Sequence, residues 1–78
     1  MPRNYFNWTA EEVMRFLKKH GFSLNHTHGS HYYYVGHYGK QFQQVCIPFH
    51  GQRSLKPRTL KAIILQSGIP KEIWLNDD

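Results

Sequence analysis

The fold of this chain is decided by residues 22–48, which read FSLNHTHGSHYYYVGHYGKQFQQVCIP and alternate with the two-residue period of β-strands. Tyrosine and valine, which favour strands, are concentrated in the middle of this stretch. Gly29 predicts a first turn, and residues 36–40, which hold two glycines, predict a second. The stretch therefore predicts three short strands in an antiparallel meander.

Alternation also sorts the side chains of the central strand between the two faces of the sheet. His31 and Tyr33 share one face, which we expect to be exposed. Tyr32 and Tyr34 share the other face, which we expect to pack toward helices. Applied to the first strand, the same rule groups four side chains on one face: Phe22, Leu24, His26 and His28.

The segment before the strands predicts a helix over residues 9–20. Thr9 is a suitable N-cap, and Glu12, three residues later, completes a capping box. Gly21 suits the position after the last helical turn. The residues that follow the helical period and predict its buried stripe are Val13, Phe16, Leu17 and His20.

Residues 57–68, PRTLKAIILQSG, predict a second helix with Pro57 in its first turn and Gly68 after its end. Because each helix carries a single apolar stripe, we expect both helices to cover the same face of the sheet. The expected class is α+β, in the order α-β-β-β-α of a double-stranded-RNA-binding-like domain. Its three-stranded antiparallel sheet would have one free face.

The length of 78 residues predicts a single small domain that spans the whole chain. We expect its core over about residues 9–69. The leader, residues 1–8, has no assigned role. The tail, residues 70–78, is expected to dock through Ile73 and Trp74.

The cellular setting is predicted from what the sequence lacks. Cys46 is the only cysteine, so an internal disulfide is impossible. The chain has no secretion signal and no run of about 18 apolar residues. These features favour a cytoplasmic protein without membrane contact. We expect no cofactor and a monomeric free protein.

The charges are distributed unevenly along the chain. The formal net charge is +5, and no acidic residue lies between Val13 and Lys71. A basic interval mixed with aromatic residues predicts a nucleic-acid ligand. The missing carboxylates exclude a two-carboxylate glycosidase and a nuclease that holds Mg²⁺ through Asp and Glu in this interval.

Four motifs follow one another at defined places: KKHGF ends the first helix, GSH opens the second strand, IPFH closes the third, and LKPRTLKAIILQSGI carries the second helix. Over roughly residues 12–69, this ordered set resembles the HicA family of toxin–antitoxin toxins. The resemblance implies a ribonuclease that cleaves messenger RNA and is neutralised by a HicB-type antitoxin. It implies that His31, in the Gly-Ser-His motif, is the catalytic histidine. Two positions depart from the family, which often has Arg in place of His26 and Gly in place of Arg58.

Cleavage of RNA requires no metal, because the 2′-hydroxyl of RNA can attack the adjacent phosphate. The protein must accept one proton and donate another, and histidine suits both tasks near neutral pH. His31 is the expected general acid or base. The other group stays open among His28, His50, Lys40 and the tyrosines, while Ser30 would orient His31 or stabilise the turn.

RNA binding would need contacts to bases and to phosphates. Tyr33, on the face expected to be exposed, is suited to stacking a base. The cations around the start of the second helix are suited to phosphates, which the helix N-terminus also attracts. The predicted RNA-binding residues are Tyr33, Lys40, Arg53, Lys56, Arg58 and Lys61.

Three alternatives to this interpretation follow from the same residues. His26, His28 and His31 offer three nitrogens for a zinc ion, but their spacing matches no standard zinc signature, and no metal site is expected. The rival functional class is a non-catalytic RNA-binding module with the same fold. A third class is an interaction protein that only holds a partner.

Overall fold

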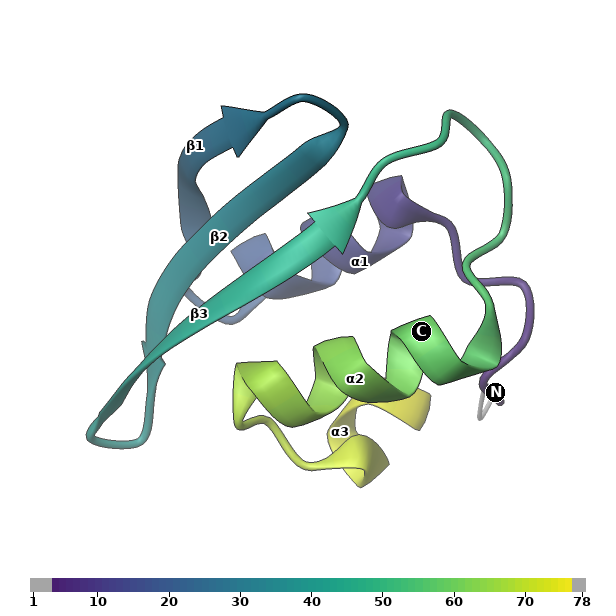
Figure 1. The fold of residues 1–78 in the computed structure, drawn as a ribbon. Helices are drawn as coiled ribbons and strands as arrows, with labels where there is room; N and C mark the ends of the chain where they lie inside the picture. The colour runs from purple at the N-terminus through teal and green to yellow at the C-terminus, as the bar shows by residue number, and fades with distance from the viewer. Residues whose placement is uncertain (1–3, 77–78) are drawn as a thin grey trace.

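The computed structural model describes residues 4–76, and its elements follow the predicted order with one short helix added (Figure 1). The predicted α+β class is confirmed, with three strands between two main helices. The elements are α1 (Ala10–Lys19), β1 (Ser23–His28), β2 (His31–Tyr38), β3 (Gln41–Pro48), α2 (Pro57–Ser67) and α3 (Lys71–Leu75).

Helix α1 begins and ends with the local signals that its sequence predicts. The Thr9 hydroxyl accepts a hydrogen bond from the Glu12 amide, and the Glu12 carboxylate accepts one from the Thr9 amide, so the capping box is complete. At the other end, the Phe22 N–H donates to the Leu17 carbonyl at 2.9 Å. The Gly21 N–H donates to Lys18, which completes a Schellman motif.

The sheet has the order β1-β2-β3, and both of its pairings are antiparallel. Its first turn consists of Gly29, at a φ of 60°, and Ser30. The second turn is shorter than predicted, because β2 continues through Gly36 and turns only at Gly39 and Lys40. Gly36 serves packing instead, since a Cβ atom there would lie 2.6 Å from the Phe22 ring.

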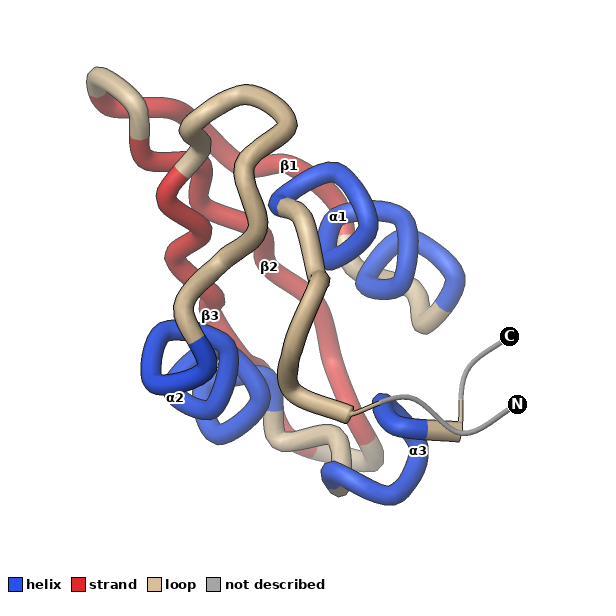
Figure 2. The backbone as a smooth tube through the Cα atoms, turned by 90° about the vertical axis from the view of Figure 1, so that its right-hand side faces the viewer, coloured by secondary structure: helices blue, strands red, loops and turns tan. Residues whose placement is uncertain are grey.

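Both main helices cover one face of the sheet, as predicted (Figure 2). The buried sheet residues are Tyr34, Val45 and Ile47, whose side chains share that face. Helix α2 adds its apolar stripe of Leu60, Ile63 and Ile64. Helix α1 adds the buried residues Ala10, Val13, Met14, Phe16 and Leu17.

The predicted alternation in β1 is wrong in one respect. The pairing register shifts between Leu24, opposite Tyr34, and His26, opposite Tyr33. This irregularity leaves Leu24 on the helix side of the sheet and His26 on the free side, so they do not share a face. The extra residue, Asn25, has no partner in the register, and its side chain contacts the His26 ring at 2.6 Å.

The core extends beyond the expected limits of 9–69 at both ends. Trp8 and Trp74 are fully buried, and their ring centroids lie 5.7 Å apart. Phe16 of α1 stacks on Trp74 at 3.9 Å. Trp74 of α3 therefore docks as predicted, whereas Ile73 is 37% exposed and does not join it.

The end of the leader runs alongside the loop that precedes α2 and is hydrogen-bonded to it (Figure 2). The Leu55 N–H donates to the Trp8 carbonyl at 2.7 Å, and Thr9 forms a β-bridge with Ser54. The Trp8 indole N–H donates to the Asn4 carbonyl. Residues 4–8 of the leader, to which the sequence assigned no role, thus fix the start of α1 against that loop.

Candidate functional site

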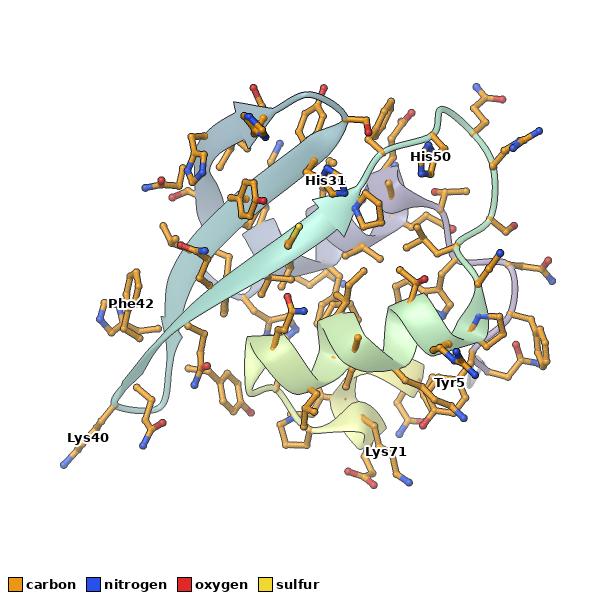
Figure 3. The ribbon with its side chains drawn as sticks, in the orientation of Figure 1. Tyr5, His31, Lys40, Phe42, His50 and Lys71 are labelled. Atoms are coloured by element: carbon orange, nitrogen blue, oxygen red, sulfur yellow. The ribbon has the colours of Figure 1, made fainter. Side chains whose placement is uncertain are left out.

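His31 is the first residue of β2 and lies at one end of the free sheet face (Figure 3). In the register it stands between His28 of β1 and Pro48 of β3. Its side chain is exposed, and no residue of the described part of the chain forms a hydrogen bond with it. Both ring nitrogens are therefore available to a ligand.

The position of His31 is fixed by the turn before it. Gly29 and Ser30 connect β1 to β2, so His28 and His31 face each other across the hairpin. The Ser30 carbonyl accepts a hydrogen bond of 2.7 Å from the N–H of Phe49, which follows β3. This main-chain bond ties the turn to the loop after β3.

A pocket of about 360 Å³ opens beside Pro48, the cross-strand partner of His31. Three of its lining side chains are predicted site residues, namely His50, Arg53 and Lys56. We call it the cation pocket, because its lining includes two cations and no carboxylate. The lining residues are Pro48, His50, Arg53, Ser54, Leu55, Lys56 and Thr59.

The start of α2 adds to the positive character of the cation pocket. Lys56 is the N-cap residue, Pro57 follows it, and the first helical turn has no acidic residue. The partial positive charge of a helix N-terminus attracts anions. Arg53, Lys56 and the N-terminus of α2 therefore give the cation pocket a positive character that suits an anion.

The other predicted phosphate ligands lie elsewhere. Lys61 stands over the ring of Tyr5 at 4.9 Å and lines a separate pocket between α2 and α3. Arg58 is exposed in the first turn of α2 but does not line the cation pocket. Lys40 sits at the tip of the β2–β3 hairpin, at the opposite end of β2 from His31 (Figure 3).

Tyr33 lies two residues from His31 on the same face and is half-buried by its neighbours. The His26 ring stacks on the Tyr33 ring with a centroid distance of 4.4 Å and an angle of 9°. A hydrogen bond to Cys46, its cross-strand partner, raises the pKa of the Tyr33 hydroxyl. Tyr33 is thus neutral near pH 7 and presents a stacked aromatic surface.

His26 is the residue of this surface that sequence reasoning placed wrongly. Strict alternation pairs it with Leu24, and only the irregularity at Asn25 turns it toward Tyr33. The signal available in the sequence was Asn25 itself, because asparagine is uncommon in regular strands. Among residues 4–76, no three side chains of His, Cys, Asp or Glu converge in a way that would hold a metal ion.

No helix within the described residues is both long and apolar enough to traverse a bilayer. A family model described as the HicA toxin of bacterial toxin–antitoxin matches residues 10–69. Comparisons with curated proteins and with solved structures gave no match. The matched span includes α1, the whole sheet with His31, the cation pocket and α2. This chain therefore belongs to the HicA family of bacterial toxin–antitoxin toxins.

Proposed function

We propose that this HicA-family protein is an endoribonuclease that cleaves messenger RNA without a metal ion. The observation that carries the proposal is the exposed imidazole of His31 beside a pocket with two cations and no carboxylate. Histidine supplies proton transfer, and the cations supply charge for a phosphate.

In the proposed reaction, the 2′-oxygen attacks the adjacent phosphorus while a general base accepts the 2′-hydroxyl proton. The bond from phosphorus to the 5′-oxygen breaks, and a general acid donates a proton to that oxygen. One fragment keeps a 2′,3′-cyclic phosphate and the other a 5′-hydroxyl. His31 performs one of the two proton transfers, and Arg53 with Lys56 stabilises the charge on the phosphorus oxygens.

Two histidines are suited to the second proton transfer. His28 is the cross-strand partner of His31, and such partners have Cβ atoms about 5 Å apart. His50 lines the cation pocket, where the phosphate would bind. The pH profile of cleavage separates them, because loss of the true partner removes one limb of a bell-shaped profile. Ala variants of both residues should be compared.

The test of the proposal is cleavage of messenger RNA by the purified chain and by His31→Ala. A positioned acid or base is worth about 10² to 10⁴ in rate, so the variant should lose at least that factor. Circular dichroism should remain unchanged, since the side chain is exposed and contributes nothing to the core. Cleavage by the unmodified chain should persist in EDTA. Full activity of His31→Ala would refute its assignment.

The same assay tests the rival class, a non-catalytic RNA-binding module. That module would bind RNA and leave it intact at every time point, with no difference between the chain and His31→Ala. The exposed His31 beside the cation pocket favours the enzyme, because RNA binding alone gives no reason to place a histidine there.

The antitoxin partner follows from membership of the family, and its binding surface belongs to the proposal. We infer that a HicB-type antitoxin covers His31 and the cation pocket with an acidic surface, because that surface is basic. The free chain would be monomeric. Arg53→Glu should weaken the complex and slow its formation, whereas Arg15→Glu, an exposed site on α1, should have little effect.

A further inference from the structure

The free face of the sheet carries a second aromatic contact, which the proposed chemistry does not use. His37 of β2 and Phe42 of β3 are cross-strand partners whose ring centroids lie 5.3 Å apart at an angle of 68°. Both are exposed, and Phe42 keeps 59% of its surface in contact with solvent. Figure 3 shows Phe42 near the tip of the hairpin, directed away from the helices. We call these two residues the outer pair.

The outer pair shares a face with His31 and Tyr33. Positions 31, 33 and 37 of β2 have the same parity, and the register is regular along the whole β2–β3 pairing. At about 3.3 Å per residue, Tyr33 lies about 7 Å from His31, and His37 lies about 20 Å from it. The free face therefore presents a row that starts at His31, passes the Tyr33–His26 stack and ends at the outer pair.

Charge distinguishes the ends of this row from its middle. Residues 23–48 contain no acidic residue, and Lys40 is their single lysine or arginine. Lys40 sits in the turn beside the outer pair, and the cation pocket sits at the His31 end. Cations at both ends with aromatic rings between them fit an RNA strand whose phosphates bind at the ends and whose bases lie on the rings.

We propose that the outer pair is a base-stacking subsite for single-stranded RNA, remote from the cleavage centre on the same strand of the sheet. The inference rests on the proposed function for the identity of the ligand. A distance of about 20 Å corresponds to about six stacked nucleotides at 3.4 Å each, and to fewer when the RNA is extended. An octanucleotide reaches the subsite, and a dinucleotide held at His31 does not.

The test measures binding of a fluorescent octanucleotide to the full chain carrying His31→Ala, which keeps the RNA intact. In that background, Phe42→Leu should weaken binding about 5- to 150-fold, because it removes the ring on which a base stacks. Phe42→Tyr keeps the ring and should bind within about twofold of the parent. Leu65→Ala, at an 83% exposed site on α2, serves as the matched surface control.

Two results would overturn the subsite. Unchanged octanucleotide binding by Phe42→Leu, with a lower free energy of unfolding, would make the outer pair a hairpin-stabilising contact. A loss of antitoxin affinity with unchanged RNA affinity would assign this face to the antitoxin.

The subsite and the proposed function can fail separately. If the unmodified chain does not cleave RNA but Phe42→Leu still weakens octanucleotide binding, the subsite is supported and the ribonuclease is refuted. If the unmodified chain cleaves RNA and Phe42→Leu binds like the parent, the subsite is refuted and the ribonuclease stands.

Discussion

Neighbouring tyrosines on the two faces of β2 have different surroundings. Tyr34 faces the helices, is 3% exposed, and has a pKa raised by burial and by the nearby Tyr32. Tyr33 faces outward, stacks on His26, and has a pKa raised by its hydrogen bond to Cys46. The residue type is the same, so the face of the sheet alone separates a core residue from a candidate ligand contact.

The largest expected difference between the two faces is the loss of stability when Tyr34 or Tyr33 is replaced by alanine. Truncation of a buried aromatic residue typically costs about 3 to 5 kcal/mol, so Tyr34→Ala should lose a large share of the stability of the domain. A domain of this length is stable by only about 4 to 12 kcal/mol. Tyr33→Ala should leave stability within about 1 kcal/mol of the parent and weaken RNA binding instead. Urea unfolding and RNA binding provide the two measurements.

The outcome that breaks the comparison is equal destabilisation by both variants. Such a result would make the Tyr33–His26 stack part of the folding core rather than a contact surface. Tyr33→Phe serves as a control, because it keeps the ring for stacking and removes only the hydrogen bond to Cys46.

Gly36 offers a second way to disturb the covered face. A Cβ atom at this position would lie 2.6 Å from the Phe22 ring and 2.9 Å from the Phe22 Cα. Because one of these neighbours is backbone, Gly36→Ala should lower the free energy of unfolding by about 1 to 3 kcal/mol. Gln44→Ala, at an exposed position on the adjacent strand, should change it by about 0.5 kcal/mol or less. Equal stability of the two variants would show that Phe22 moves aside at little cost.

Much of the fold could be predicted because its signals are local. The capping box of Thr9 and Glu12 closes within one helical turn, and alternation along β2 requires only that a strand forms there. The same alternation placed His31 and Tyr33 on one face, although the pattern alone barely favoured that face as the exposed one. These features depend on residues close in sequence, so the sequence contains what is needed to predict them.

The remaining features depend on pairing between distant segments. A single unpaired residue, Asn25, moves His26 to the other face, and alternation does not reveal where a register shifts. Trp8 looked like part of a leader, yet it is buried against Trp74, which lies 66 positions further along the chain. The predicted cations also divide between two pockets: Arg53 and Lys56 line the cation pocket, whereas Lys61 faces Tyr5. This division depends on where the leader passes α2.

That division of the cations gives the third prediction. Replacement of Arg53 and Lys56 by glutamine should make the slope of log affinity against log salt less negative by about 1.4, or 0.7 for each lost phosphate contact with single-stranded RNA. Lys61→Gln should leave the slope unchanged, because Lys61 faces Tyr5 and lines a different pocket. RNA binding measured across a range of salt concentrations checks this expectation. A larger change in the salt slope from Lys61→Gln than from the Arg53 and Lys56 replacements would show that phosphate binds beside Lys61 rather than in the cation pocket.

The smallest expected effect concerns ionisation of the covered face. Burial raises the pKa of Tyr34 above its ordinary value of about 10, so the native state holds this proton more tightly than the unfolded chain does. The resulting stability is fully present below about pH 10 and is lost as the pH rises through the native-state pKa, because the unfolded chain ionises first. Tyr34→Phe should therefore flatten the fall in the free energy of unfolding as the pH rises above about 10. Tyr33→Phe removes a second raised pKa, whose first cause is the hydrogen bond to Cys46 rather than burial. An unchanged dependence of the unfolding free energy on pH in Tyr34→Phe would contradict this expectation. It would show that ionisation of the buried Tyr34 does not contribute to the loss of stability at alkaline pH.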